Sequence, residues 1–357
     1  MGYRILVINP GSTSTKLAYF EDGKQVYGVS VEHGAEEISG FSDVLEQENF
    51  RADIVENVML MWGLDKEKLS AVIGRGGLLP HMKAGGYIVD EEMVDALREG
   101  VASPHASNLG ALLAWSVAEP LGIPAYIYDS VTSDEFEEVA KITGIPGIKR
   151  ESMCHVLNMK AVAREVANKF GMEYEELNLI TAHLGGGISI GAHKNGRIVD
   201  ALRDDEGPMS PERAGTVPLL HMIDLCYSGK YTKKEMTRKI RGQGGLKAYL
   251  GTVDGRLIEE MIREGNEEAK LIYEAQAYQI AKGIGRLATV LKGNVDCIIL
   301  TGGTANSKLL TSLVEERVGF IAPVEIVPGE REMEALAAGA ERILNGESVR
   351  RYSEVER

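Results

Sequence analysis

The chain has 357 residues, of which 44% are hydrophobic and 26% are charged, a composition typical of a globular protein with room for two domains. Its 39 lysines and arginines face 53 aspartates and glutamates, and the resulting net charge of −14 gives no general attraction to nucleic acid or to an anionic membrane. Three cysteines without a CxxC pair argue against a disulfide framework or a zinc cage and favour a reducing cytoplasm. The first apolar run, residues 5–8, is too short for a signal peptide.

Short apolar strands alternate with helical segments along the chain. In chain order, the sequence predicts strands at 5–8 and 16–20, helices at 91–99 and 106–117, a strand at 125–128, helices at 159–170 and 270–292, a strand at 297–301 and a helix from about 332. Strands that alternate with helices indicate an α/β architecture.

One pattern occurs twice. Residues 5–24 and 179–197 each contain an apolar strand, a turn of small residues, a second strand and a hairpin turn, Asp22–Gly23 or Asn195–Gly196. A repeat at such a long spacing indicates a duplicated domain rather than a solenoid. We expect domains at 1–148 and 149–332, with a C-terminal helix at about 333–357 that returns to the first domain.

Three turns of small residues have the features of phosphate or nucleotide binding. They are Asn9–Lys16 (NPGSTSTK), His183–Ser189 (HLGGGIS) and Leu300–Ser307 (LTGGTANS). Small residues let backbone amides approach an anion closely, and hydroxyls add donors. Neither a Walker loop nor a GxGxxG fingerprint is present. Any one of the three is compatible with an ordinary turn, but two matched turns in two halves favour phosphate binding.

Several charged or ionisable residues lie next to glycine or at the ends of predicted elements. Arg75 lies in Gly74–Arg75–Gly76–Gly77 and Arg213 in Pro211–Glu212–Arg213–Ala214–Gly215, and a guanidinium suits the bidentate binding of a carboxylate or phosphate. His105, His155 and His183 lie at element boundaries, Asp129 ends a strand and Glu332 begins the last helix. Ordinary structural roles, such as a helix cap or a solvated charge, stay open for each of them.

Together these segments resemble the acetokinase family of the acetate and sugar kinase/Hsp70/actin superfamily, over nearly the whole chain. NPGSTSTK and HLGGGIS resemble the two phosphate segments of the family, and LTGGTANS resembles its adenosine segment. The stretches GRGGLL, SPHASNLGALLA and EGPMSPERAG are more similar to the butyrate kinases of the family than to its acetate kinases. Two departures from the acetate kinases are Gly186, where those enzymes have asparagine, and PERAG in place of a longer GTRSG pattern.

This resemblance implies a fold and an activity. The implied fold is α/β, with two duplicated ribonuclease-H-like domains of the actin-like ATPase type and a central cleft. The implied enzyme is cytoplasmic, forms a homodimer or larger homo-oligomer, and uses ATP and Mg²⁺. It converts a short-chain fatty acid, butyrate in the first place, into an acyl phosphate by direct in-line transfer. Branched-chain, acetate or propionate kinases are the nearer alternatives.

The resemblance also implies roles for individual residues. The implied catalytic residues are Arg75, Arg213, His155 and Asp129. Arg75 and His105 would bind the substrate, and Leu78, Leu79 and Pro80 are candidates for the wall of its pocket. Asp129 and Glu332 would hold the metal, with Glu330 and Glu334 close in register to Glu332. The implied phosphate and nucleotide residues are Asn9, Gly11, Ser12, Ser14, Lys16, His183, Gly185, Gly186, Gly187, Gly302, Gly303 and Asn306.

The chemistry of the residues fits an anionic acceptor. A carboxylic acid is ionised at neutral pH and needs no general base, so a catalyst has to supply cations and donors around the transferred phosphoryl group. A sugar kinase would instead need an acidic base, for which Asp129 is available. A non-catalytic actin-like ATP-binding protein is the more distant alternative, and it would leave the two arginines without a purpose.

Overall fold

The structure is a computed structural model that describes residues 2–80, 82–102 and 104–355. The described chain forms two compact units, Met1–Asp134 with Arg331–Arg357 (unit 1) and Glu135–Glu330 (unit 2). Residues 356 and 357, the end of the expected C-terminal segment, lie outside the described residues.

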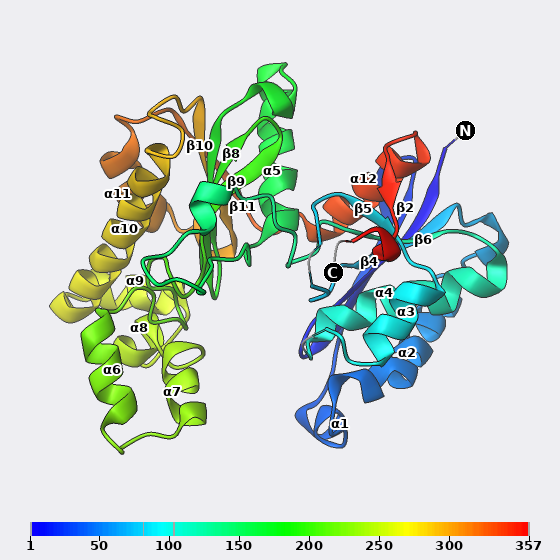
Figure 1. The fold of residues 1–357 in the computed structure, drawn as a ribbon, viewed down its shortest axis with the longest axis horizontal. Helices are drawn as coiled ribbons and strands as arrows, with labels where there is room; N and C mark the ends of the chain where they lie inside the picture. The colour runs from blue at the N-terminus through cyan, green and yellow to red at the C-terminus, as the bar shows by residue number, and fades with distance from the viewer. Residues whose placement is uncertain (1, 81, 103, 356–357) are drawn as a thin grey trace. The chain divides into compact units, whose positions relative to one another are not determined.

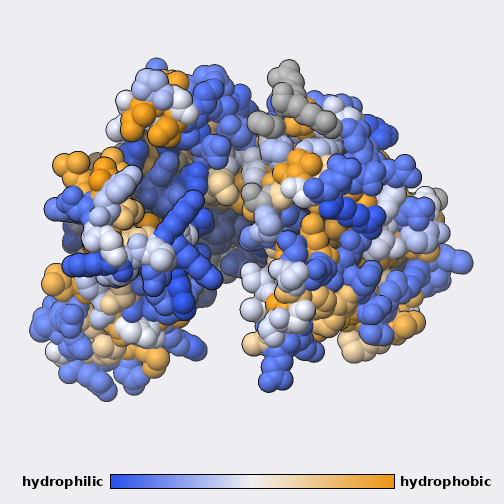
Figure 2. All heavy atoms as spheres, turned by 60° about the horizontal axis from the view of Figure 1, so that its bottom comes forward, coloured by the Kyte–Doolittle hydropathy of each residue, from blue (hydrophilic) through white to orange (hydrophobic). Residues whose placement is uncertain are grey.

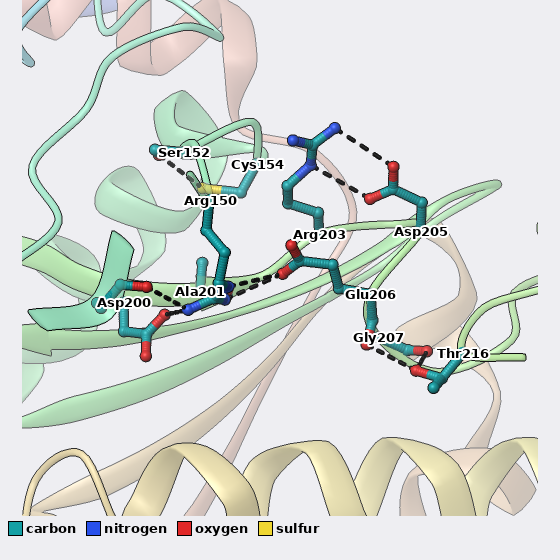
Figure 3. Close-up of polar contacts among 11 residues, drawn as sticks. Arg150, Ser152, Cys154, Asp200, Ala201, Arg203, Asp205, Glu206, Gly207 and Thr216 are labelled. Carbon is teal, nitrogen blue, oxygen red and sulfur yellow. Dashed lines mark hydrogen bonds and ion pairs between the residues drawn. The ribbon is translucent and has the colours of Figure 1, made fainter. Parts of the chain in front are cut away.

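The division falls at Asp134, earlier than the boundary at residue 148 that the sequence suggested. Residues 135–150 belong with unit 2 because Arg150 ties them to its sheet. Arg150 forms ion pairs with Asp200 (2.8 Å) and Glu206 (3.0 Å), and it donates to the carbonyl oxygen of Ala201 at 2.5 Å (Figure 3). Phe136 also packs with Ile198 and Ala201 of unit 2, so ion pairs and apolar packing together join this segment to unit 2, and local sequence composition does not mark the boundary.

Unit 1 contains a seven-stranded sheet with the strand order β12-β5-β6-β4-β1-β2-β3. Its strands are β1 (Arg4–Pro10), β2 (Ser14–Glu21), β3 (Lys24–Glu32), β4 (Ala71–Arg75), β5 (Gly86–Ile88), β6 (Ala125–Tyr128) and β12 (Val349–Arg350). β1, β2 and β3 are antiparallel neighbours, whereas β1, β4 and β6 run parallel.

Unit 2 contains a five-stranded sheet with the strand order β11-β10-β7-β8-β9. Its strands are β7 (Leu179–Leu184), β8 (Ile188–Lys194), β9 (Arg197–Leu202), β10 (Cys297–Gly302) and β11 (Val324–Pro328). Again three antiparallel strands, β7 to β9, are followed by two strands that extend the sheet in parallel from β7. The two units repeat one α/β topology, so the predicted pair of ribonuclease-H-like units is confirmed.

The helices of unit 1 are α1 (Ala35–Ser39), α2 (Glu48–Met61), α3 (Glu91–Arg98), α4 (Leu109–Ala118) and α12 (Glu332–Leu344). Those of unit 2 are α5 (Val156–Phe170), α6 (Leu219–Tyr227), α7 (Lys233–Ile240), α8 (Gly245–Leu250), α9 (Gly255–Arg263), α10 (Glu267–Ala288) and α11 (Lys308–Val318). Short 3-10 turns include η3 (Ala106–Asn108) and η7 (Gly303–Asn306). Helix α12 follows β11 of unit 2 but packs on β1, β4 and β6 of unit 1, beside which it is drawn in red (Figure 1).

Local sequence explains why several of these elements begin and end where they do. The hairpin turn Asp22–Gly23 has φ values of 52° and 73°, and Asn195–Gly196 has 51° and 71°, the left-handed backbone that two-residue hairpin loops require. Asp90 accepts a hydrogen bond from the backbone of Met93 and so caps α3. Ile5–Ile8 is fully buried, as expected for a central strand that is covered on both faces.

The surface agrees with the acidic composition. Figure 2 shows mostly hydrophilic side chains on the viewed face, with apolar side chains in separate patches. In the described ranges, no helix combines the length and the apolar character that crossing a bilayer requires.

Candidate active site

In unit 1, three of the predicted residues lie at the same edge of the sheet. β1, β4 and β6 are parallel, and the register places Ile8 beside Gly74 and Arg75 beside Tyr128. The carboxyl ends of parallel strands meet at one edge, where ligands bind in open α/β sheets. Asn9, Arg75 and Asp129 therefore lie on adjacent strand ends.

Glu332 joins this edge from the first turn of α12. Its carboxylate forms an ion pair with the Arg75 guanidinium at 3.2 Å and accepts a hydrogen bond from the Asn9 side-chain amide at 2.7 Å. The side chains of Arg75 and Glu332 are 24% and 12% exposed, so the pair is shielded from water yet open on one side. Arg75 thus presents a charge in a fixed orientation, which is the geometry that binding of a carboxylate or phosphate needs.

The glycines around Arg75 have a structural reason that the sequence did not reveal. A Cβ on Gly74 would lie 2.0 Å from the carbonyl oxygen of Gly110, and one on Gly76 would lie 2.8 Å from the Cα of Ser130. Both distances are too short for any side chain, because the end of β4 packs directly on α4 and the backbone just after β4 packs on the segment that follows β6. These glycines fix the path of the backbone at Arg75 rather than merely leaving an anion a free approach.

Asp129 directly follows β6 and is 4% exposed, with a left-handed φ of 44°. Its side chain accepts a hydrogen bond from the backbone of Gly85 at 2.9 Å. His105 is exposed, and its Nδ1 is hydrogen-bonded to the hydroxyl of Ser107 at 2.7 Å. His105 thus begins η3 as a capping residue, a role that is compatible with contact to a ligand but does not require one.

The first turn connects β1 to β2. The amide of Gly11 donates to the carbonyl of Ser14 at 2.8 Å, which closes the turn, and Ser12 at its tip is exposed. Lys16 lies on β2 directly opposite Asn9. The turn therefore presents hydroxyls, amides and one lysine next to the Arg75–Glu332 pair.

In unit 2, His183 lies on β7 just before the three glycines, and it is 2% exposed. The side-chain amide of Asn158, on α5, donates to His183 Nδ1 at 2.9 Å. A neutral His183 then carries its proton on Nε2. A Cβ on Gly185 would lie 3.0 Å from this Nε2 atom, so the N–H group lies against the glycine turn, where it can donate to an anion.

His155 stacks on His183, with ring centroids 3.9 Å apart and an angle of 12° between the rings. Its Nδ1 is hydrogen-bonded to the hydroxyl of Ser189, on β8, at 3.0 Å. The two predicted histidines thus form one aromatic pair, whose ring positions are set by Asn158 and Ser189.

Arg213 is held beside the same turn. The Ser210 hydroxyl donates to the carbonyl of Gly186 at 2.5 Å and accepts from the backbone of Arg213 at 3.1 Å. The Arg213 side chain forms an ion pair with Asp204 at 3.1 Å. Each of the two predicted arginines is therefore paired with a carboxylate of its own unit, Arg75 with Glu332 and Arg213 with Asp204.

The third turn, at the end of β10, is attached to the end of β7. Gly302 has a φ of 90°, and a Cβ there would lie 2.4 Å from the carbonyl oxygen of Leu184. The Thr304 hydroxyl donates to that same oxygen at 2.6 Å. Around Gly303 a Cβ would meet nothing within 4 Å, and Asn306 is exposed. This leaves an open glycine surface next to the second phosphate turn.

Sequence reasoning missed three supporting residues. Asn158 lies on α5, three positions after His155, which directly precedes that helix, and this short spacing was the one available signal. Ser210 and Asp204 lie in the irregular segment before Arg213 and carry no pattern that marks them.

The described residues of the two units contain no preformed cluster of metal-binding side chains. Within residues 2–80, 82–102 and 104–355, no group of three or more histidine, cysteine, aspartate or glutamate side chains is arranged to hold an ion. Mg²⁺ commonly binds through one or two carboxylates together with substrate phosphates and water. Asp129 and Glu332 are oxygen donors at one edge of unit 1, and they fit that kind of site.

The repeated sheets, together with a glycine turn after the first strand of unit 2, define an α/β fold shared with several kinases. The structure is similar to Porphyromonas gingivalis acetate kinase (22% identity, TM-score 0.79, 96% of this chain and 100% of that one). It is also similar to a propionate kinase from Francisella tularensis subsp. tularensis SCHU S4 (18% identity, TM-score 0.74, 94% of this chain and 98% of that one). A third similar structure is the ROK hexokinase from Thermus thermophilus (14% identity, TM-score 0.50, 96% of this chain and 100% of that one). At these identities the likeness shows the fold alone.

A comparison of the sequence with models of protein families identifies the family of this chain. The model of the acetokinase family matches residues 141–345, more than half of the chain. The chain therefore belongs to the acetokinase family.

Proposed function

We propose that this protein transfers the γ-phosphoryl group of ATP to a short-chain carboxylate, with butyrate as the preferred acid, to give an acyl phosphate and ADP. The observation that carries the proposal is the family match over residues 141–345. Within that range, His155, His183, the glycine turn and Arg213 are connected through Ser210 and ring stacking.

The proposed reaction is a direct in-line displacement. A carboxylate oxygen attacks the γ-phosphorus, a new P–O bond forms, and the bond to the bridging oxygen of ADP breaks. Because the acid is already ionised at neutral pH, no base is needed. The main obstacle is repulsion between two anions, which cations and hydrogen-bond donors in the site reduce.

In this proposal, unit 1 binds the acid. Arg75 is the group for the carboxylate, and its ion pair with Glu332 fixes the guanidinium before the substrate arrives. His105 lies at the start of η3 as an additional donor to the acid. Leu79, which follows the Arg75 loop and is buried, is a candidate for the apolar wall of the pocket, together with the partly buried Leu78 and Pro80.

Unit 2 binds ATP in this proposal. The amides of Gly185–Gly187 and the Nε2–H group of His183 donate to phosphate oxygens. Arg213 and His155 stabilise the charge on the transferring phosphoryl group. Gly302, Gly303 and Asn306 form the open surface for the adenosine. In unit 1, we propose the first turn, with Asn9, Gly11, Ser12, Ser14 and Lys16, as a further phosphate-binding segment.

Mg²⁺ would be held by Asp129 and Glu332 and would neutralise part of the charge on the phosphates. The donor types fit, since both are hard oxygen ligands. Glu332 would then have two tasks, because its carboxylate also orients Arg75.

Butyrate is proposed over acetate from the resemblance of GRGGLL, SPHASNLGALLA and EGPMSPERAG to butyrate kinases. Two additional buried methylene groups provide about 1.6 kcal/mol, or roughly 15-fold in kcat/KM. Two of the solved structures with similar folds are named as an acetate kinase and a propionate kinase, so these acids, with branched-chain acids such as isobutyrate, are the alternative substrates. We place the enzyme in the cytoplasm and expect a homodimer or a larger homo-oligomer.

The test is a hydroxamate assay for acyl phosphate with ATP, Mg²⁺ and acetate, propionate, butyrate, isobutyrate or hexanoate. We expect kcat/KM to peak at the four-carbon acids. A peak at acetate with a steady fall at longer chains would make the protein an acetate kinase. Absence of product with every acid, together with phosphorylation of a sugar, would reject the proposal.

A further inference from the structure

A buried arginine that forms no ion pair with a carboxylate among the described residues lies next to the first phosphate turn. Arg51, on α2, is 0% exposed. Its guanidinium donates to the side-chain oxygen of Gln47 from both Nε (3.1 Å) and an Nη atom (2.8 Å). It also donates to the carbonyl oxygen of Ser14 at 2.9 Å and to the hydroxyl of Thr15 at 3.1 Å.

All of these acceptors are neutral. A buried charge is ordinarily paired with an opposite charge, because removing an ion from water is costly. Burial is the cause that lowers the pKa of Arg51, and no carboxylate contributes to that shift. Burial and then the charge of Arg51 lower the pKa of His33, against the smaller raising effects of Glu37 and Glu32. The positive charge of Arg51 is therefore not neutralised within unit 1 by any contact of the described residues.

Hydrogen bonds connect this charge to the turn. Ser14 O accepts from both Arg51 and the amide of Gly11, so this carbonyl is fully occupied. Thr15 accepts from Arg51 and is 2.8 Å from His33 Nε2, and the backbone amide of His33 donates to the carbonyl of Thr13 at 2.8 Å. Arg51 and His33 together hold the inner side of the turn, and its carbonyls at residues 13 and 14 are engaged there.

We propose that Arg51 is a positioning residue for phosphate binding: it fixes the turn Asn9–Lys16 and places an uncompensated positive charge beneath it. This inference rests on the proposed function, because it takes that turn as the one that meets the phosphates of ATP. The cation acts across a poorly screened interior, in which a unit charge several ångströms from an anion changes affinity by roughly tenfold or more.

The decisive variant is Gln47→Glu. Gln47 is buried and already contacts Arg51 through two hydrogen bonds, so a glutamate there forms an ion pair in the same geometry and cancels the charge while Arg51 stays in place. The matched control is Asn49→Asp, which adds the same negative charge to an exposed position of α2, where water and salt screen it.

Affinities are measured by calorimetry for ATP, ADP and adenosine, and folding of unit 1 is followed through Trp62 and Trp115. We expect Gln47→Glu to weaken ATP binding roughly tenfold or more, ADP less, and adenosine not at all, with folding retained and Asn49→Asp equal to the parent protein. Unchanged ATP affinity in folded Gln47→Glu, or an equal loss for ATP and adenosine, would overturn the inference.

A second pair of variants tests the same proposal if the Gln47→Glu protein does not fold. Arg51→Met removes the charge, and Arg51→Lys keeps it but cannot reach Gln47, Ser14 and Thr15 together. We expect ATP to bind more tightly to Arg51→Lys than to Arg51→Met; equal loss in both would contradict a role for the charge. Because these assays measure nucleotide binding, they stay informative if the hydroxamate assay shows that no acid is phosphorylated.

Discussion

Acid should destabilise unit 2 through one buried histidine. His193, on β8, is 0% exposed and lies between the hydroxyls of Tyr174 and Thr181, each 2.7 Å from one ring nitrogen. Burial, with Lys160 and Arg164 nearby, lowers the pKa of His193 from 6.5 to about 3. The folded protein therefore keeps this imidazole neutral at pH values at which the unfolded chain has already taken up a proton.

The sign and size of the effect follow from this difference. Because the folded pKa lies below the unfolded one, the contribution is complete above pH 6.5 and is lost as the pH falls toward 3. Below pH 6.5 the free energy of unfolding should fall by about 1.4 kcal/mol for each pH unit, which amounts to about 1.4 kcal/mol between pH 7.5 and 5.5.

The assay is urea unfolding at several pH values, with hydrogen exchange in peptides from β7 and β8 as the probe of unit 2. Both tryptophans of the chain, Trp62 and Trp115, lie in unit 1, so fluorescence reports separately on that unit. His193→Gln does not titrate and should flatten the pH dependence of unit 2, whatever its stability at neutral pH. An unchanged slope in this variant, or an imidazole ¹⁵N shift that titrates near pH 6 in the folded protein, would refute the reasoning.

Three further predictions concern the site. Arg75→Ala and Arg213→Ala should each cost about 2–5 kcal/mol of transition-state stabilisation. In steady-state kinetics, only Arg75→Ala should also raise the KM for the acid. Small and equal effects of the two substitutions would contradict the assignment. Glu332→Gln should raise the Mg²⁺ concentration for half-maximal rate roughly tenfold, or about 1.4 kcal/mol; superimposable Mg²⁺ titrations would exclude a metal-binding role. Gly302→Ala should lower the free energy of unfolding by at least about 1 kcal/mol, whereas Gly303→Ala should leave it nearly unchanged in denaturant titrations.

Features that depend on neighbouring residues were predictable from the sequence. The two hairpin turns, the strand at Ala125–Tyr128 and the start of the last helix at Glu332 all match the structure. Each depends on a short run of residues: left-handed backbone at the turns, a continuous buried run in the strand and acidic residues in the first turn of the helix. The information is therefore local. The duplicated topology was predictable for the same reason, since two local patterns of the same kind fold in the same way.

The partners of the charged residues depended on tertiary structure. Glu332 contacts Arg75, which is 257 residues away in the sequence, and Asn9, which is 323 residues away. Asn158 forms a hydrogen bond with His183, which is 25 residues away. No local pattern specifies such contacts, because they form only once parallel strand ends and a returning helix meet at one edge. Arg51 is the clearest case, because only the packing of α2 against the first turn buries its charge among neutral acceptors.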